Sequence, residues 1–326
     1  MNENAINKYL NGRFFTVVIF CFTVISALVS LYSNKIPQFD GNFGICLPSS
    51  NLWIGNDLLS WGVNILLISG IAVILIIINK IFPFIRSVTA VFASIFLLLE
   101  SCNPYVTTQL LDGTIMCLIT VAGIFILYST YQAPQLKRLI FLIFFLLSVC
   151  SMFQYAFLFL IPIFIIGLIQ MRALTLKGLI AAILGLLTPY WIAIGTGIIS
   201  LDMLAVPEIS SIFTANELGN VPELLINASI TAFISLVLLI INLLNVFNSK
   251  LQTRAYNGFI SILSLFSIIM IFIDYNNILT YIPLLNCCAA IQIAHFFTNS
   301  KYLRKYIIIA VVIIVYLTLY IWRIFL

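Results

Sequence analysis

Long apolar segments recur along the whole chain and are separated by short stretches that hold most of its polar residues. Hydrophobic residues fill 63% of the 326 positions and charged residues 8%, whereas soluble domains average about 45–50% and 25%. A helix needs about 20 apolar residues to cross a bilayer. The sequence therefore predicts an all-α bundle of transmembrane helices, one integral membrane domain over residues 1–326, with no soluble domain.

The charge balance excludes two other classes. A net charge of +5 from 15 basic and 10 acidic residues is too dilute for the basic surface that binds nucleic acid. The apolar content is likewise far above that of disordered chains. We therefore expect a membrane lipid, and no nucleic acid, as a partner.

Eleven apolar segments are candidate spans, within a range of ten to twelve. The fifth and sixth are short for a bilayer of about 30 Å and are joined only by Gln154 and Tyr155, so they form either one hairpin or one broken helix. The segments are Phe14–Tyr32, Leu58–Ile78, Phe82–Leu99, Leu110–Tyr128, Leu139–Phe153, Ala156–Met171, Gly178–Ile198, Leu224–Phe247, Ala255–Ile273, Thr280–Phe297 and Tyr306–Trp322.

The distribution of basic residues orients these segments. All Lys and Arg residues except Lys35 and Arg323 fall in loops on the side of the N-terminus. Because cytoplasmic loops carry an excess of Lys and Arg, the N-terminus is predicted to be cytoplasmic, and an odd number of spans places the C-terminus outside. The first segment is longer than a signal-peptide core and no A-x-A site follows it, so we interpret it as a retained helix.

Two loops on the outer side are longer than simple connections, which is typical of functional loops. The first, residues 34–57, combines Asp40 and Asp57 with aromatic residues. These aromatics serve either as interfacial anchors or as part of a substrate loop. The second, residues 199–223, places Ile209, Ile212 and Phe213 at helical spacing, which is typical of a short interfacial helix; the alternative is an ordinary loop.

Two further acids, Glu100 and Asp112, end the third segment and begin the fourth. One interpretation is that both are solvated helix ends at headgroup depth. The other is that they converge with Asp40 and Asp57 on the outer side, because carboxylates are costly within a bilayer and mark functional sites there.

Other polar and small residues within the segments favour structural roles. His295 is expected to be an interfacial histidine with its hydrogen bonds satisfied. The small residues Gly178, Ala181, Ala182 and Gly185 predict a close helix contact. A disulfide between Cys46 and Cys102, the two cysteines on the outer side, is conceivable. The sequence has no zinc-ligand spacing and no nucleotide-binding glycine motif, so it predicts no metal ligand and names no cofactor.

Three stretches share a pattern of polar and proline positions in an apolar background: NKIFPFIR, LLDGTIMCLITVAGIFILY and the stretch from Leu158 to Ala193, with Asp112, Pro162, Arg172 and Thr188-Pro189-Tyr190 as those positions. In these stretches the chain resembles an uncharacterised family of bacterial polytopic inner-membrane proteins. The resemblance implies a location in the bacterial inner membrane and no particular activity.

The chain has a long acidic outer loop directly after the first helix. This arrangement is similar to that of the GT-C superfamily of glycosyltransferases, which use lipid-linked sugars. In that superfamily an acid of this loop lies at the catalytic site, and the resemblance gives this role to Asp40. It also implies a polyprenyl-phosphate-linked sugar as substrate, with Asp57, Glu100, Asp112 and Lys35 as the substrate-binding candidates.

Three functional interpretations are consistent with these observations. The first is a GT-C-like glycosyltransferase, or a related factor of envelope polysaccharide assembly, acting on the outer side. The second is a non-catalytic transporter or flippase. The third is a scaffold subunit whose outer loops bind a membrane protein partner.

Overall fold

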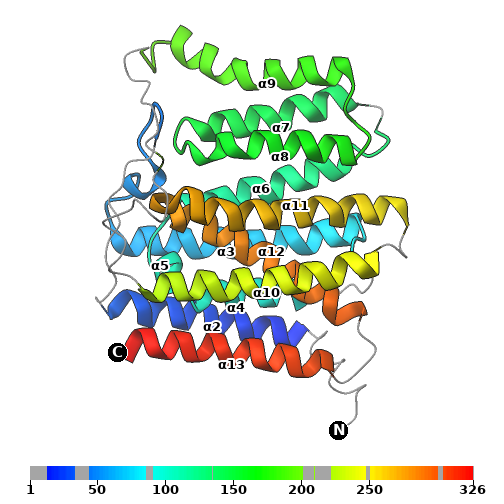
Figure 1. The fold of residues 1–326 in the computed structure, drawn as a ribbon. Coiled ribbons are helices and arrows are strands. Elements are labelled where there is room, and N and C mark those ends of the chain that lie inside the picture. Colours follow the sequence, from blue (N-terminus) through cyan, green and yellow to red (C-terminus); the bar gives the residue numbers. More distant parts are fainter. Residues whose placement is uncertain are drawn as a thin grey trace.

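The computed structural model describes residues 13–33, 44–85, 91–133, 135–200, 209, 222–246, 250–299 and 304–325. The described part is a bundle of helices that lie side by side, with α9 at one edge and α2 and α13 at the other (Figure 1). The helices are α2 (Arg13–Tyr32), α3 (Asp57–Ile81), α4 (Val91–Ser101), α5 (Pro104–Thr107), α6 (Asp112–Ser129), α7 (Leu136–Ser151), α8 (Ala156–Gln170), α9 (Leu176–Gly195), α10 (Pro222–Val246), α11 (Leu251–Ile273), α12 (Ile278–Asn299) and α13 (Arg304–Phe325).

The all-α membrane architecture agrees with the prediction, but the number of spans is not confirmed. Each predicted segment overlaps a helix. Among the described residues, however, seven helices are long and apolar enough to cross a membrane. Helix α4, α8 and the stretch Ala310–Trp322 are apolar but shorter. The prediction of eleven spans therefore exceeds what helix length and composition support.

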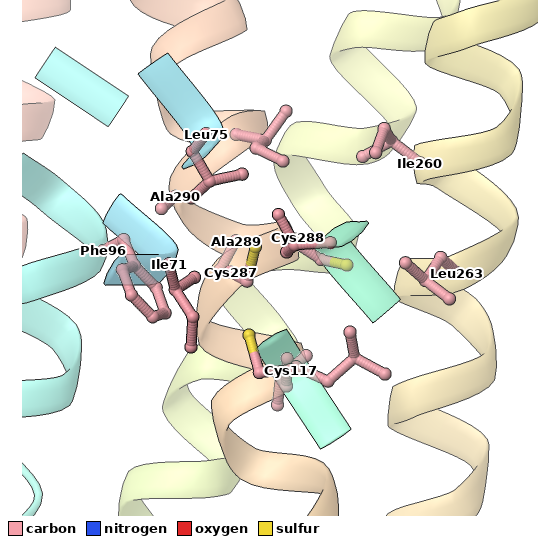
Figure 2. Packing of buried hydrophobic residues seen from close by; sticks show 14 of the residues in the cluster. Ile71, Leu75, Phe96, Cys117, Ile260, Leu263, Cys287, Cys288, Ala289 and Ala290 are labelled. Atoms are coloured by element: carbon pink, nitrogen blue, oxygen red, sulfur yellow. The ribbon is translucent and has the colours of Figure 1, made fainter. Parts of the chain in front are cut away.

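Helix α12 lies at the centre of the bundle. Its residues 278–295 are all buried, and it packs on α4, α6, α10 and α11. Cys287, Cys288, Ala289 and Ala290 present small side chains to these neighbours, and Figure 2 shows them surrounded by larger apolar residues, Phe96 of α4 among them. Small residues allow helix backbones to approach closely, which is how helices associate within a bilayer.

A proline and a glycine explain the closest approach between α6 and α12. Pro283 lies inside α12, and because it has no N–H it donates no hydrogen bond to the carbonyl of Leu279. Gly113 of α6 packs against this carbonyl so closely that an added Cβ would lie 2.3 Å from the Leu279 oxygen and 3.0 Å from the Pro283 ring. Only glycine fits this position.

The predicted small-residue contact is confirmed at the edge of the bundle, where α9 packs on α7. Gly178, Ala182 and Gly185 are buried. An added Cβ would lie 2.8 Å from Ile140 Cδ1 at Gly178, and 2.6 Å from the Phe141 carbonyl oxygen at Gly185. The small residues of α9 are therefore spaced so that they face α7.

The segment between α4 and α6 is a break within the bundle. Helix α4 ends at Ser101, the single turn α5 follows, and residues 101–107 are all buried. Side chains of α3 satisfy the irregular backbone: Asn64 Nδ2 donates to the carbonyl of Val106 (2.7 Å), and Ser60 Oγ accepts from the N–H of Leu110 (2.8 Å). Such backbone is tolerated at membrane depth only where protein groups satisfy it.

Several sequence predictions concern the loops. Between residues 201 and 221 of the second outer loop, Ile209 alone is described, and its side chain is exposed. The predicted interfacial helix, with Ile212 and Phe213, lies outside the described residues. All seven cysteines are described and are free thiols, so Cys46 and Cys102 are not joined by a disulfide in this structure.

Candidate functional site

Buried polar side chains gather at the end of the bundle where α6, α8 and α12 begin and α11 ends. The charge distribution predicts that this end faces outside. We call this cluster the Asp112–Asp274 network. Its members are all buried and are Ser50, Asp112, Gln154, Tyr155, Asp274, Asn277, Thr280 and Tyr281.

Asp112 is the first residue of α6, where the helix dipole favours a negative charge. One of its oxygens, Oδ1, accepts hydrogen bonds from the backbone N–H of Ser50 (2.8 Å) and from Ser50 Oγ (2.5 Å). The other, Oδ2, accepts from Gln154 Nε2 (3.3 Å). The carboxylate of α6 thereby connects the first outer loop with the turn between α7 and α8.

Gln154 links the two carboxylates of the network. Its Nε2 lies 3.3 Å from Asp112 Oδ2, 3.3 Å from Asn277 Oδ1 and 3.2 Å from Thr280 Oγ1. A primary amide has only two N–H groups, so these three acceptors share two hydrogens. Asn277 in turn donates to Asp274 Oδ2 (3.1 Å), which completes a continuous path from one carboxylate to the other.

Asp274 is completely buried and is held by neutral donors. The Tyr155 hydroxyl donates to Oδ1 (2.8 Å) and the Tyr281 hydroxyl donates to Oδ2 (2.8 Å), while Asn277 Nδ2 donates both to Oδ2 and to the Tyr155 oxygen. Burial raises the pKa of the Asp274 carboxyl above its ordinary value, and the hydrogen bonds from Asn277, Tyr155 and Tyr281 oppose this rise. The carboxyl is thus a stronger proton acceptor than an exposed aspartate.

The described part of the first outer loop covers this network. The backbone N–H groups of Cys46 and Leu47 both donate to the carbonyl of Met152, at 3.2 and 3.0 Å. Trp53 packs edge-on against Phe153, with ring centroids 5.0 Å apart. These contacts fix residues 44–56 on the α7–α8 turn and place Ser50 on Asp112.

The network contains the groups that bind hydroxyls and accept protons. It has two carboxylates, two phenols and two amides at one end of a membrane bundle. Within the described residues, no group of three or more His, Cys, Asp or Glu side chains is arranged to hold a metal ion.

The structure separates the candidate site residues. Asp40, the catalytic candidate, and Lys35 lie outside the described residues. Asp57 is exposed in the first turn of α3, where Asn56 caps the helix by accepting from the N–H groups of Leu58 and Leu59. Of the predicted substrate-binding acids, Asp112 alone belongs to the network.

Glu100 lies in a different environment. It is completely buried, and its Oε1 accepts a hydrogen bond from Asn286 Nδ2 of α12 (3.3 Å). Asp112 is 7% exposed. The interpretation of both acids as solvated helix ends is therefore wrong, because the α4–α5 break carries their connection into the protein interior.

His295 is buried, and its Nε2 lies 2.6 Å from Asn257 Oδ1. The prediction of a histidine with a satisfied hydrogen bond is confirmed.

Sequence reasoning missed the Asp274 half of the network. Asp274 stands in a short DYNN connection between two apolar segments, and Gln154-Tyr155 stands in the shortest connection of the chain. Polar residues confined to very short turns on the same side of a membrane are brought together by the packing of the helices they join. The sequence feature that could have identified the network is that Asp274 and Gln154-Tyr155 lie in short turns on the same predicted side of the membrane.

Comparisons of the chain with protein-family models, with curated proteins and with solved structures found no match. The Asp112–Asp274 network and the buried Glu100 are therefore the features of the molecule that point to a function.

Proposed function

We propose that this membrane protein is a GT-C-like glycosyltransferase, or a related factor of envelope polysaccharide assembly, that acts at the outer face of the bacterial inner membrane. One observation carries the proposal: residues 44–56 of the first outer loop are fixed over a buried network with two carboxylates at the predicted outer end of the bundle. Asp40 belongs to the same loop, a few residues before the described part.

The proposed reaction needs a proton acceptor. The hydroxyl oxygen of an acceptor attacks the anomeric carbon of the sugar, the bond from that carbon to the phosphate oxygen breaks, and the polyprenyl phosphate leaves with the electron pair. The hydroxyl proton passes to a carboxylate, for which we propose Asp40. Asp112 and Asp57 are proposed to accept hydrogen bonds from substrate hydroxyls, and Lys35 to contact the phosphate.

A non-catalytic transporter or flippase is the second candidate, and different observations favour it. Helix α4 is interrupted near a buried acid, and broken helices commonly form the binding sites of transporters. Amides and a histidine also follow one another along the buried residues 278–295 of α12, including Asn286, Gln292 and His295.

The orientation requires its own test. We expect reporter fusions after Ser50 to be active only outside the cytoplasm and fusions after Thr130 to be active only inside it. Cytoplasmic activity of the Ser50 fusion would place the network on the inner side and contradict an outer-face enzyme.

Asp40→Asn distinguishes catalysis from the other roles. In a deletion strain complemented with this variant, we expect a loss of about 10²-fold in transfer of sugar to surface glycan, because the amide cannot accept the proton. Protein level and glycan composition are measured together. Trp191→Ala, at a side chain of α9 that is 79% exposed, is the control and is expected to retain full activity.

Full complementation by Asp40→Asn at a normal protein level would reject the catalytic role and favour the transporter. Asp274→Asn then becomes informative, since loss of transport with a normal protein level would still assign the network a role in substrate binding.

A further inference from the structure

Glu100 and Asp274 are the two acids of the described chain that are completely buried, and Glu100 lies outside the Asp112–Asp274 network. Its residue is completely buried near the end of α4 and faces Asn286, which lies about two turns, or roughly 12 Å, into α12 from its outer end. Phe96 of α4 and Cys287 of α12 belong to the apolar core around this level (Figure 2). An isolated ionised carboxylate is very costly in such surroundings.

Glu100 and Asn286 form a pair in which one oxygen of each side chain has no hydrogen-bond donor among the described residues. Asn286 Nδ2 donates to Glu100 Oε1 (3.3 Å). Glu100 Oε2 and Asn286 Oδ1 are both buried and have no hydrogen-bond partner among the described residues. Both atoms are acceptors, so the pair has two acceptors without a donor. Native structures rarely leave buried polar atoms unsatisfied.

We propose that the Glu100–Asn286 pair is a proton-binding site, in which Glu100 is a neutral carboxylic acid that carries its proton on Oε2. The proton converts one of the unpaired acceptors into the donor that the pair lacks. It also removes the charge that the apolar interior disfavours. This site is independent of the proposed transfer reaction.

Among the side chains that the structure describes, none near Glu100 carries a positive charge to compensate a negative one. Cys117 of α6 is near enough to Glu100 to interact electrostatically, and a thiol is neutral at pH 7. Asp57 and Lys80 are exposed at opposite ends of α3, and His295 is engaged with Asn257. The titratable residues with described side chains on the elements packed against α4 are Cys21 and Tyr32 of α2, Asp57 and Lys80 of α3, Tyr105 of α5, Tyr281, Cys287, Cys288 and His295 of α12, and Tyr316 and Tyr320 of α13.

Infrared spectroscopy of the full-length protein in lipid nanodiscs tests the proposal directly. A protonated carboxylic acid has a carbonyl band, distinct from the bands of a carboxylate, that shifts in D₂O. We expect this band at pH 7 in the difference spectrum between the wild type and Glu100→Gln. Other buried acids, such as Asp112 and Asp274, cancel in this difference because both proteins contain them.

Asp57→Asn is the matched control, since it removes an exposed carboxyl, and its difference spectrum is expected to lack the band at pH 7. Absence of the band in the Glu100→Gln difference would show that Glu100 is ionised and would overturn the proposal. If Glu100→Gln does not fold, Asn286→Ala replaces it. Loss of the Nδ2 donor is then expected to shift the acid band, and an unchanged band would contradict the assignment.

A bound monovalent cation is the other ligand that would satisfy two unpaired oxygens, but it requires an ionised Glu100. The band is therefore measured in potassium and in sodium buffers. An unchanged band supports the proton, whereas loss of the band in sodium overturns it in favour of a cation site.

Discussion

Helices α12 and α9 are both apolar, yet they occupy opposite positions in the bundle. Helix α12 is the less apolar of the two, and an 18-residue window of it is entirely buried, whereas 28% of the corresponding window of α9 is buried. Leu184 and Trp191 of α9 are 53% and 79% exposed. In this protein, therefore, the more polar helix lies inside.

The different positions of α12 and α9 follow from the lipid that surrounds the bundle. Lipid tails are as apolar as leucine, so an apolar face gains little by leaving them. Polar groups gain much more by finding partners inside the protein. Asn242 Nδ2 donates to the carbonyl and the side-chain oxygen of Gln292 on α12, at 2.9 and 2.7 Å. Helix α12 has several such partners, and α9 depends mainly on its contact with α7.

The largest predicted effect is at the centre of the bundle. Gly113→Ala would place a Cβ 2.3 Å from the Leu279 carbonyl oxygen, and α12 cannot move away because helices pack around it. We expect a loss of stability of about 3 kcal/mol or more, at the upper end of overpacking costs. The measurement is the thermal unfolding midpoint in detergent.

Gly70→Ala is the control for that substitution. Gly70 lies within α3, and nothing is within 4 Å of the position of an added Cβ. Alanine is the better helix former, so the variant is expected to match the wild type or exceed it. A similar loss in both variants would contradict the packing argument.

The next effect concerns the network on α12. Tyr281→Phe removes the hydroxyl that donates to Asp274 Oδ2 and leaves a buried acceptor with fewer donors, which costs about 1–3 kcal/mol. Tyr275→Phe removes the hydroxyl of another buried tyrosine, which is not a member of the network, and is expected to change the unfolding midpoint much less. Equal effects would mean that the Asp274 contact contributes nothing.

A smaller effect is expected at the edge. Gly185→Ala would place a Cβ 2.6 Å from the Phe141 carbonyl oxygen, a clash nearly as severe as that at Gly113. Helix α9 can move outward, however, because it packs mainly on α7. We expect a loss of about 1 kcal/mol, at the low end of overpacking costs. A loss as large as that of Gly113→Ala would show that α9 is held as firmly as α12.

Hydropathy and spacing predicted the helical class and the small-residue face of α9, because both follow from local composition. They did not predict which helix is central. That depends on pairs such as Asn242 with Gln292 and Glu100 with Asn286, whose partners are far apart in sequence. Asp112 was found as an acid at a segment boundary, whereas Asp274 was missed because its significance arises only when Gln154 and Tyr155 are brought next to it by packing.

The smallest effect is a change in the pH dependence of stability. It tests whether burial, which disfavours the ionised form of Asp274, outweighs the hydrogen bonds that favour this form. Burial raises the pKa of the Asp274 carboxyl in the folded state, and three hydrogen bonds partly offset that rise. The folded protein therefore keeps this proton to a higher pH than the unfolded chain does. In the interval between the ordinary aspartate pKa and the raised folded value, the folded state binds more protons, so stability falls as pH rises. Asp274→Asn is expected to remove this fall in the thermal unfolding midpoint, whereas Asp57→Asn, at an exposed carboxyl, is expected to retain it. An unchanged fall in Asp274→Asn would mean that the hydrogen bonds from Tyr155, Tyr281 and Asn277 outweigh burial, so that the folded pKa does not exceed its ordinary value.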